Sequence, residues 1–344
     1  MDGVGFLVVR TGALAAVVAV ALGGCSAIPQ LPEMYRGDWE PVVLERVAPQ
    51  APHRVAFQFN KPVEVVQVLF DPEVTVESTH WADGMLQIET EEPLRAGAEY
   101  WVDAILRDDS GNMASILVSF YGINPRLPEV IINEFVCRGS GNNPDFAELR
   151  VLEAGNLGGM TLYNGSPSHW TTRVIMPEME VQADDYVIVH FRREFTPEEI
   201  TETTDKAESG GLRSHPDAWD VWAPEDAGLP TTSGGLTLTA YPDGPLLDAV
   251  LWSDRSYDAT SDRRGFGTVA QMNIFEEVVA LGGWQIAGAY VVPDDGVDPS
   301  SSTATRSINR SSLGTDTDNR EDWHITPTRG ATPGTVNSDE VYVP

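Results

Sequence analysis

The sequence contains very little cysteine and very little lysine. Its 344 residues include two cysteines, Cys25 and Cys137, and two lysines, Lys61 and Lys206. Two cysteines can form at most one intramolecular disulfide, so a disulfide-rich scaffold is excluded and stability has to come from hydrophobic cores. The 52 acidic and 22 basic residues give a net charge of −30. Such a chain repels phosphate groups, which argues against nucleic acid as a partner.

No apolar run is long enough to cross a membrane as a helix. Residues 11–22 carry no charge, but a spanning helix needs ~20 apolar residues. The run has the length of the apolar core of a signal peptide. The 31 glycines and 24 prolines make up about a sixth of the chain, above the average share of about 12%. This excess favours a turn-rich β protein.

The apolar run ends in Leu22-Gly-Gly-Cys25-Ser26. This segment resembles the bacterial lipobox, in which the chain is cut before a cysteine that then carries lipid. The resemblance implies a signal peptide at 1–24, a lipid anchor with acyl chains such as palmitate at Cys25, and a bilayer as partner. Ser26 resembles the outer-membrane sorting class, so we expect a cell-envelope protein facing the periplasm or the surface. An ordinary cleaved signal peptide is the alternative.

After this leader we expect a proline-containing tether at 25–41 and a first β domain at 42–122. The residue pattern predicts strands at 55–59, 75–77, 85–89, 100–106 and 114–121. Asp83-Gly84 is a strong hairpin signal. The motifs resemble those of a bacterial Ig-like domain of the surface-layer type: Phe57 to Val63, then Pro93, Leu94, Gly97 and Tyr100, then Asp108, Gly111 and Asn112. The resemblance implies a β-sandwich in which Tyr100 is a tyrosine-corner residue.

A proline-containing boundary at 123–128 precedes a second β domain, expected at 129–338. Predicted strands include 130–136, 145–149, 184–190, 233–238 and 247–252. The chain resembles the lamin-tail domain, an Ig-like sandwich, in these pieces: Asn133-Glu134, Asp145 to Leu149, Asn156 to Leu162, Ser307 to Arg310, Asp322-Trp323 and Thr332 to Asn337. The sequence therefore predicts an all-β protein of two tandem Ig-like sandwiches.

The second domain carries two insertions, at about 191–230 and 253–303. In the first, Thr196 followed by Pro197 predicts the start of a helix, with Thr196 as N-cap. Loop insertions of this size commonly carry function.

Three polar residues, Asn133, Glu134 and Glu148, are interpreted from the lamin-tail resemblance as fold-signature groups that pair with backbone or arginine. The alternative is an acid–base pair in which Glu134 and Glu148 act together with Asp145. Cys137 follows an apolar strand, so we expect a buried, unreactive thiol. The histidines are scattered singly, and neither Gly-x-Ser-x-Gly nor His-Glu-x-x-His occurs. The chain is accordingly expected not to be an enzyme.

Two further groups of residues are candidates for ligand binding. Asp316, Asp318 and Asp322 place carboxylates in a short segment, as a calcium site requires, although the spacing departs from an EF-hand loop. Trp219 and Trp222 lie close to acidic residues, and exposed aromatic rings beside carboxylates suit sugar rings. Packing of the insertion onto the sandwich is the alternative for the tryptophans. No other cofactor is expected.

These observations predict a membrane-anchored envelope lipoprotein that is structural, adhesive or ligand-presenting, with envelope glycans or surface proteins as partners. A carbohydrate-binding surface protein is one alternative. A secreted hydrolase with a metal-assisted site in the inserted loops is the other.

Overall fold

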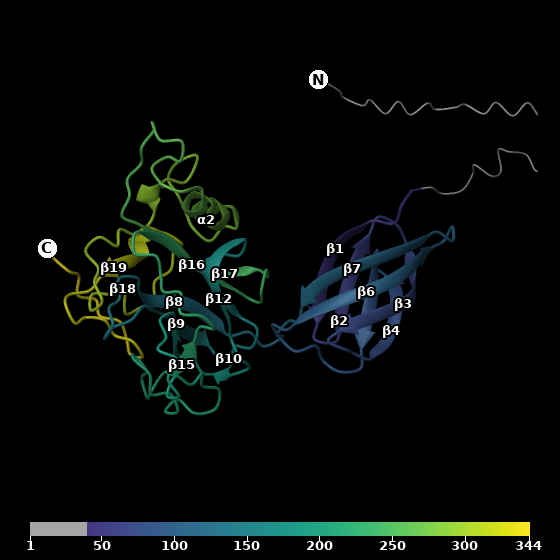
Figure 1. The fold of residues 1–344 in the computed structure, drawn as a ribbon, viewed down its shortest axis with the longest axis horizontal. Helices are drawn as coiled ribbons and strands as arrows, with labels where there is room; N and C mark the ends of the chain where they lie inside the picture. The colour runs from purple at the N-terminus through teal and green to yellow at the C-terminus, as the bar shows by residue number, and fades with distance from the viewer. Residues whose placement is uncertain (1–39) are drawn as a thin grey trace, which may run out of the picture. The chain divides into compact units, whose positions relative to one another are not determined.

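The computed structural model describes residues 40–344. The predicted signal peptide at 1–24, Cys25 and nearly all of the predicted tether at 25–41 lie outside the described residues. Within residues 40–344 no helix is both long and apolar enough to span a membrane. The described chain is nearly all β, as predicted, and its strands form two sandwiches (Figure 1).

The first sandwich packs a four-stranded sheet against a three-stranded sheet. The four-stranded sheet has the order β1-β2-β5-β4, with β1 Leu44–Ala51, β2 Arg54–Phe59, β5 Met85–Thr90 and β4 Val76–Ala82. The three-stranded sheet has the order β3-β6-β7, with β3 Val63–Asp71, β6 Glu99–Asp108 and β7 Met113–Tyr121. Along β6, buried and exposed residues alternate almost strictly, because successive side chains of a strand point to opposite faces. The inward set forms the core, around Phe57, Val102 and Phe120.

Turn chemistry explains how these strands connect. Asp83 and Gly84 both have positive φ, at 53° and 77°, and form the two-residue hairpin turn that the sequence predicts between β4 and β5. The Tyr100 hydroxyl accepts a hydrogen bond of 2.9 Å from the backbone N–H of Arg95, which is the contact of a tyrosine corner. Asp108 accepts bonds from the backbone N–H groups of Ser110 and Asn112. The Asn112 side chain holds the pKa of Asp108 down at about 2.

The second sandwich has a six-stranded sheet and a four-stranded sheet. The six-stranded order is β15-β14-β9-β8-β18-β19, with β15 Trp219–Trp222, β14 Tyr186–His190, β9 Phe146–Glu153, β8 Glu129–Val136, β18 Ile308–Arg310 and β19 Trp323–Ile325. The four-stranded order is β12-β11-β16-β17, with β12 His169–Ile175, β11 Thr161–Ser166, β16 Ser233–Thr239 and β17 Leu246–Ser253. The short strands β10 Gly155–Asn156 and β13 Glu180–Val181 pair separately. A continuous apolar core around Phe135, Leu149 and Trp252 joins the two larger sheets.

The first insertion differs from its prediction. The helix expected from Thr196 does not form, and residues 196–199 adopt turns instead. The Glu199 carboxylate accepts bonds from the backbone N–H groups of Glu194 and Phe195, which holds the chain in this turn and leaves Glu199 buried. The same insertion then supplies β15, which pairs in parallel with β14.

The second insertion contains a helix that the sequence analysis did not predict. Helix α2, Val269–Ala280, begins at Thr268, whose side chain caps the backbone N–H of Gln271. Its buried residues Ile274, Phe275 and Val278 join the core of the second sandwich. The Glu277 carboxylate accepts hydrogen bonds from Ser166, the last residue of β11, and from Ser168 just after it. These bonds connect the helix to the four-stranded sheet.

Candidate functional site

Asn133, Glu134 and Glu148 lie together on β8 and β9, the two central strands of the six-stranded sheet. Glu134 on β8 is directly opposite Glu148 on β9, and both are fully buried. Asn133 donates to Glu148 at 2.7 Å and exchanges hydrogen bonds with the side chain of Asn337. The structure therefore brings the three predicted signature residues into one network.

This network holds the C-terminal segment against the sheet. Glu134 accepts bonds from the backbone N–H and the hydroxyl of Thr332, and Glu148 accepts one of 2.6 Å from the backbone N–H of Gly334. Burial raises the pKa of Glu134, and burial together with the charge of Glu134 raises the pKa of Glu148 well above its usual range. The two carboxyl groups thus act as anchors for residues 332–337. The alternative acid–base trio does not form around Asp145, whose oxygens accept from the backbone N–H groups of Gly139 and Leu229 instead.

The Cys137 thiol follows β8 and is fully buried. Burial, reinforced by the nearby charge of Asp145, raises its pKa to about 12. The thiol therefore stays protonated at physiological pH.

The predicted metal residues surround the buried side chain of Arg310. Its guanidinium lies 3.0 Å from Asp248, 2.9 Å from Asp316 and 3.4 Å from Asp322, and it stacks over the ring of Trp323. Three carboxylates, those of Asp248, Asp316 and Asp318, have oxygens within 4.8 Å of one another. Asp322 is not one of the three, and its oxygens accept from the hydroxyl and backbone N–H of Thr317 and from Arg310. The predicted grouping therefore differs from the structure, in which Asp248 from β17, far away in sequence, joins Asp316 and Asp318 in place of Asp322.

Trp219 and Trp222 are buried, with 8% and 6% of their surface exposed. The expectation of exposed rings for stacking on sugars is therefore wrong. Trp222 stacks on His190 with ring centroids 3.9 Å apart, and His190 Nε2 lies 2.7 Å from Asp220. The indole N–H of Trp219 donates to Asp185. The physical reason is that these residues form β15, whose side chains pack the insertion onto the sandwich.

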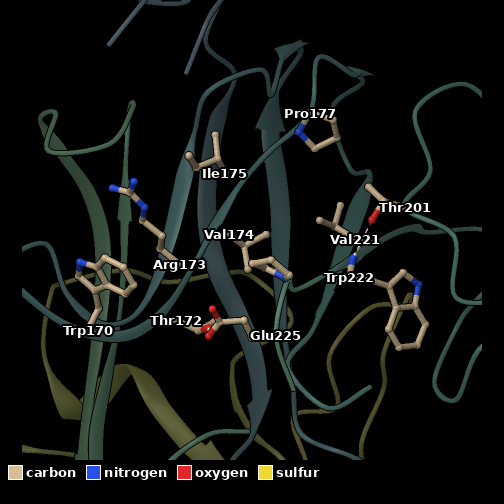
Figure 2. Close-up of a pocket in the computed structure, with 11 residues that line it drawn as sticks. Trp170, Thr172, Arg173, Val174, Ile175, Pro177, Thr201, Val221, Trp222 and Glu225 are labelled. Atoms are coloured by element: carbon tan, nitrogen blue, oxygen red, sulfur yellow. Dashed lines mark hydrogen bonds between the residues drawn. The ribbon is translucent and has the colours of Figure 1, made fainter. Parts of the chain in front are cut away.

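A hollow of about 490 Å³ opens between β12 and β15, and Figure 2 shows its lining. One wall consists of residues of β12 and Pro177; the other consists of Thr201, Val221, Trp222, Pro224 and Glu225. We call this hollow the edge groove, because β12 and β15 are the outermost strands of the two sheets. Trp170 and Arg173 lie together at one end in Figure 2, and Trp222 lies at the other.

Contacts with neighbouring side chains hold Arg173, Thr172 and Glu225 in place in the edge groove. The Arg173 guanidinium stacks over the Trp170 ring, 5.2 Å from its centroid, and donates to the Tyr121 hydroxyl. Thr172 donates to Glu225 at 3.3 Å. Trp170 is 44% exposed and Ile175 38% exposed, so apolar surface faces solvent along β12. The groove can accept a ligand that has both apolar and hydrogen-bonding parts.

Sequence reasoning did not identify β12. Its residues, His-Trp-Thr-Thr-Arg-Val-Ile, are rich in β-branched and aromatic side chains, and this composition is a strand signal. The same signal could have located the groove wall, although not the strand that faces it.

The fold and the groove define a class: an all-β protein of two sandwiches, with a groove between the edge strands β12 and β15 of the second. Residues 128–325 match the family model TP_1001_2nd, described as a protein second domain. This match covers more than half of the chain, and the chain belongs to this family.

A curated relative from Treponema pallidum (strain Nichols), described as an uncharacterized protein, is 24% identical over 152 residues. The match covers 43% of this chain and 38% of the relative, so it spans well under two thirds of the relative's length. Two solved structures show weaker likeness. A DUF4876 family protein from Bacteroides thetaiotaomicron has a TM-score of 0.29 at 11% identity, covering 83% of this chain and 92% of its own. L,D-transpeptidase 3 from Mycobacterium tuberculosis has a TM-score of 0.17 at 13% identity, covering 42% of this chain and 81% of its own. These TM-scores are too low for either likeness to define fold or function.

Proposed function

We propose that this chain is a lipid-anchored protein of the bacterial cell envelope that binds a ligand without catalysing a reaction. The lipobox-like segment ending at Cys25 supports the anchor. Two or more acyl chains on one residue would hold the protein stably in a bilayer, where a single chain would not. The net charge of −30 suits a solvated surface.

The observation that carries the binding role is the edge groove, where exposed Trp170 and Ile175 border a hollow of about 490 Å³. The buried carboxylates Glu134 and Glu148 support a non-catalytic role, because their oxygens are engaged in holding the C-terminal segment.

Anchoring is tested by metabolic labelling with radioactive palmitate in a bacterial host. Label on the wild-type chain and none on Cys25→Ala is the expected result, with Cys137→Ala as the matched control that keeps its label. Detergent phase partitioning should move Cys25→Ala to the aqueous phase. Protease treatment of intact cells then shows which side of the outer membrane the protein faces. An unlabelled wild-type chain would overturn the anchor.

We further infer that the second sandwich is related to lamin-tail domains. The segments that resemble the lamin-tail pattern contact one another, which supports this inference. Asn133 and Glu134 contact the Thr332 to Asn337 segment, and Asn337 donates to the Arg310 carbonyl.

A calcium site at Asp248, Asp316 and Asp318 is a second proposal. Arg310 contributes one positive charge to a cluster that also includes Asp322. The negative charge of the cluster therefore exceeds the positive. Burial and the neighbouring charge of Asp316 raise the pKa of Asp318, and a hard cation with oxygen ligands would relieve this repulsion.

A further inference from the structure

The two main sheets of the second sandwich have four outer strands. Within residues 40–344, other segments hydrogen-bond to the outer edges of three of these strands and not to the fourth. The backbone of β17 is covered by Val297, which donates to the Leu251 carbonyl and accepts from the Ser253 N–H, both at 2.9 Å. The backbone of β15 is covered by Glu202. Its N–H donates to the Asp220 carbonyl, and its carboxylate accepts from the Asp220 N–H. At β19, Tyr342 N–H donates to the Ile325 carbonyl at 2.7 Å. Among residues 40–344, no segment makes a comparable backbone bond to the outer edge of β12.

The register of β12 identifies which backbone groups face outward. Met176 N–H donates to Met160 at 2.7 Å, and the β11–β12 register continues from that pair. Antiparallel pairs alternate between hydrogen-bonded and non-hydrogen-bonded, so Val174 bonds with Leu162 while Arg173 and Ile175 do not bond with β11. The backbone N–H and C=O groups of Arg173 and Ile175 therefore point away from β11, toward the edge groove.

Nothing in the β12 residues blocks this edge. Proteins protect open edges with lysine, proline or charged side chains. Arg173 is the only residue of β12 with a permanent charge, and its side chain is held by the Trp170 ring and the Tyr121 hydroxyl. Pro177 comes two residues after the strand ends. An unprotected edge beside a hollow is the geometry used for strand addition.

We propose that the edge groove binds an extended polypeptide segment of another protein, which adds to β12 as a fifth strand of the four-stranded sheet. Its backbone pairs with Arg173 and Ile175. Its alternate side chains enter the hollow against Pro177, Val221 and Trp222. This inference rests on the proposed binding function and names the class of its ligand.

Charge complementarity defines the partner further. Glu225 is exposed at the groove, and its carboxylate accepts a hydrogen bond from the Thr172 hydroxyl. Within residues 40–344 this carboxylate makes no ion pair. A lysine or arginine in the added segment would pair with it. A second copy of this chain is disfavoured as the partner, because two copies would each bring a net charge of −30.

The test uses a proline at the outward-facing amide. Ile175→Pro removes the outward N–H and leaves the bonds between Val174 and Leu162 in place. Ile175→Thr is the matched control, because it keeps the N–H and a β-branched side chain. The probe is a random linear heptapeptide display library selected on the full chain, followed by synthesis of the selected peptides.

The selected peptides should bind wild type and Ile175→Thr alike and bind Ile175→Pro at least tenfold more weakly. In an added strand, every second peptide amide faces β12 and the others face away. N-methylation of the amides that face β12 should abolish binding, whereas methylation of the others should not. Hydrogen exchange on the wild-type chain needs no variant: the amides of Arg173 and Ile175 should exchange rapidly alone and become protected with peptide. Failure to select peptides, or peptides indifferent to both changes, overturns the proposal.

Two other outcomes would also overturn it. A glycan-array ligand whose binding depends on Trp170 and leaves these amides unprotected would make the groove a saccharide site. A dimer seen by sedimentation that Ile175→Pro disrupts would make a second copy the occupant. Palmitate labelling at Cys25 is unaffected by each of these results, so the anchor and the ligand class are tested separately.

Discussion

Glu134 and Glu148 face each other across neighbouring antiparallel strands, and both side chains are completely buried. Two carboxylates this close would repel if both were charged, yet each accepts hydrogen bonds from the C-terminal segment. The pair therefore joins the strand pair β8–β9 to residues nearly two hundred positions later. The stability of the second sandwich should depend on it.

Removing one of these anchors should destabilise the fold. Glu134→Ala leaves the Thr332 N–H and hydroxyl without their acceptor and should lower the free energy of unfolding by about 2–4 kcal/mol. Urea unfolding of the full chain measures this loss. Glu129→Ala, at the exposed start of β8, is the control and should change it by less than about 0.5 kcal/mol. Equal effects of the two substitutions would contradict the anchoring role.

The stability of the chain should fall as pH rises from about 5 to 7. Burial raises the pKa of Asp248 to about 7, and those of Glu134 and Glu148 are also raised. A group whose folded pKa is raised contributes stability that is complete below its unfolded pKa and is lost as pH rises through the folded value. The contribution of Asp248 corresponds to about 2 kcal/mol over this window, since one proton changes stability by about 1.4 kcal/mol per pH unit.

Denaturant unfolding at several pH values checks this, and Asp248→Asn should give a flatter profile. Asp103→Asn, at an exposed site on β6, should keep the wild-type slope. A wild-type profile that rises between pH 5 and 7 would contradict the argument.

Calcium should raise the melting temperature if the acidic cluster around Arg310 holds it. A free calcium concentration of 100 times Kd would stabilise the fold by about 2.7 kcal/mol, and EDTA should reverse the shift. The double substitution Asp316→Asn/Asp318→Asn should abolish the response, whereas Asp294→Asn in a separate acidic segment should retain it. Identical melting curves with calcium and EDTA would remove the site.

Trp222 should matter for stability because it is buried against His190 and donates to Ser209. Trp222→Ala should cost about 3–5 kcal/mol, as expected for a large buried ring. Trp170→Ala removes a half-exposed ring and should cost far less. Thermal and urea unfolding distinguish the two, and a near-neutral Trp222→Ala would show that β15 is not packed as described.

Cys137 should resist thiol reagents in the folded protein. Its thiolate is scarce, because burial and the charge of Asp145 raise its pKa to about 12, and reagent access is blocked. Ellman's reagent should react with the Cys25→Ala protein only after a denaturant is added. Rapid labelling under native conditions would show that the region around β8 opens.

Much of the local structure was predictable because it depends on neighbours in sequence. Short-range residue patterns predicted the strands β2 and β6, and Asp83-Gly84 predicted the hairpin between β4 and β5, since only a few residue types adopt two successive positive φ angles. The helix predicted at Thr196 failed because the Glu199 carboxylate bonded nearby backbone N–H groups and stabilised a turn. Helix α2 was missed because its helical pattern lies within loop-like flanking sequence.

The sequence by itself determined an all-β protein in two parts, with a strongly acidic surface and too few cysteines for a disulfide framework. These properties follow from composition and short-range pattern. Only the tertiary structure decided that Asp248 joins Asp316 and Asp318, that Trp219 and Trp222 are buried, and that β12 has an open edge while β15, β17 and β19 are covered. The physical reason is that each of these outcomes depends on which distant segments pair, and strand pairing is set by the packing of the whole sandwich.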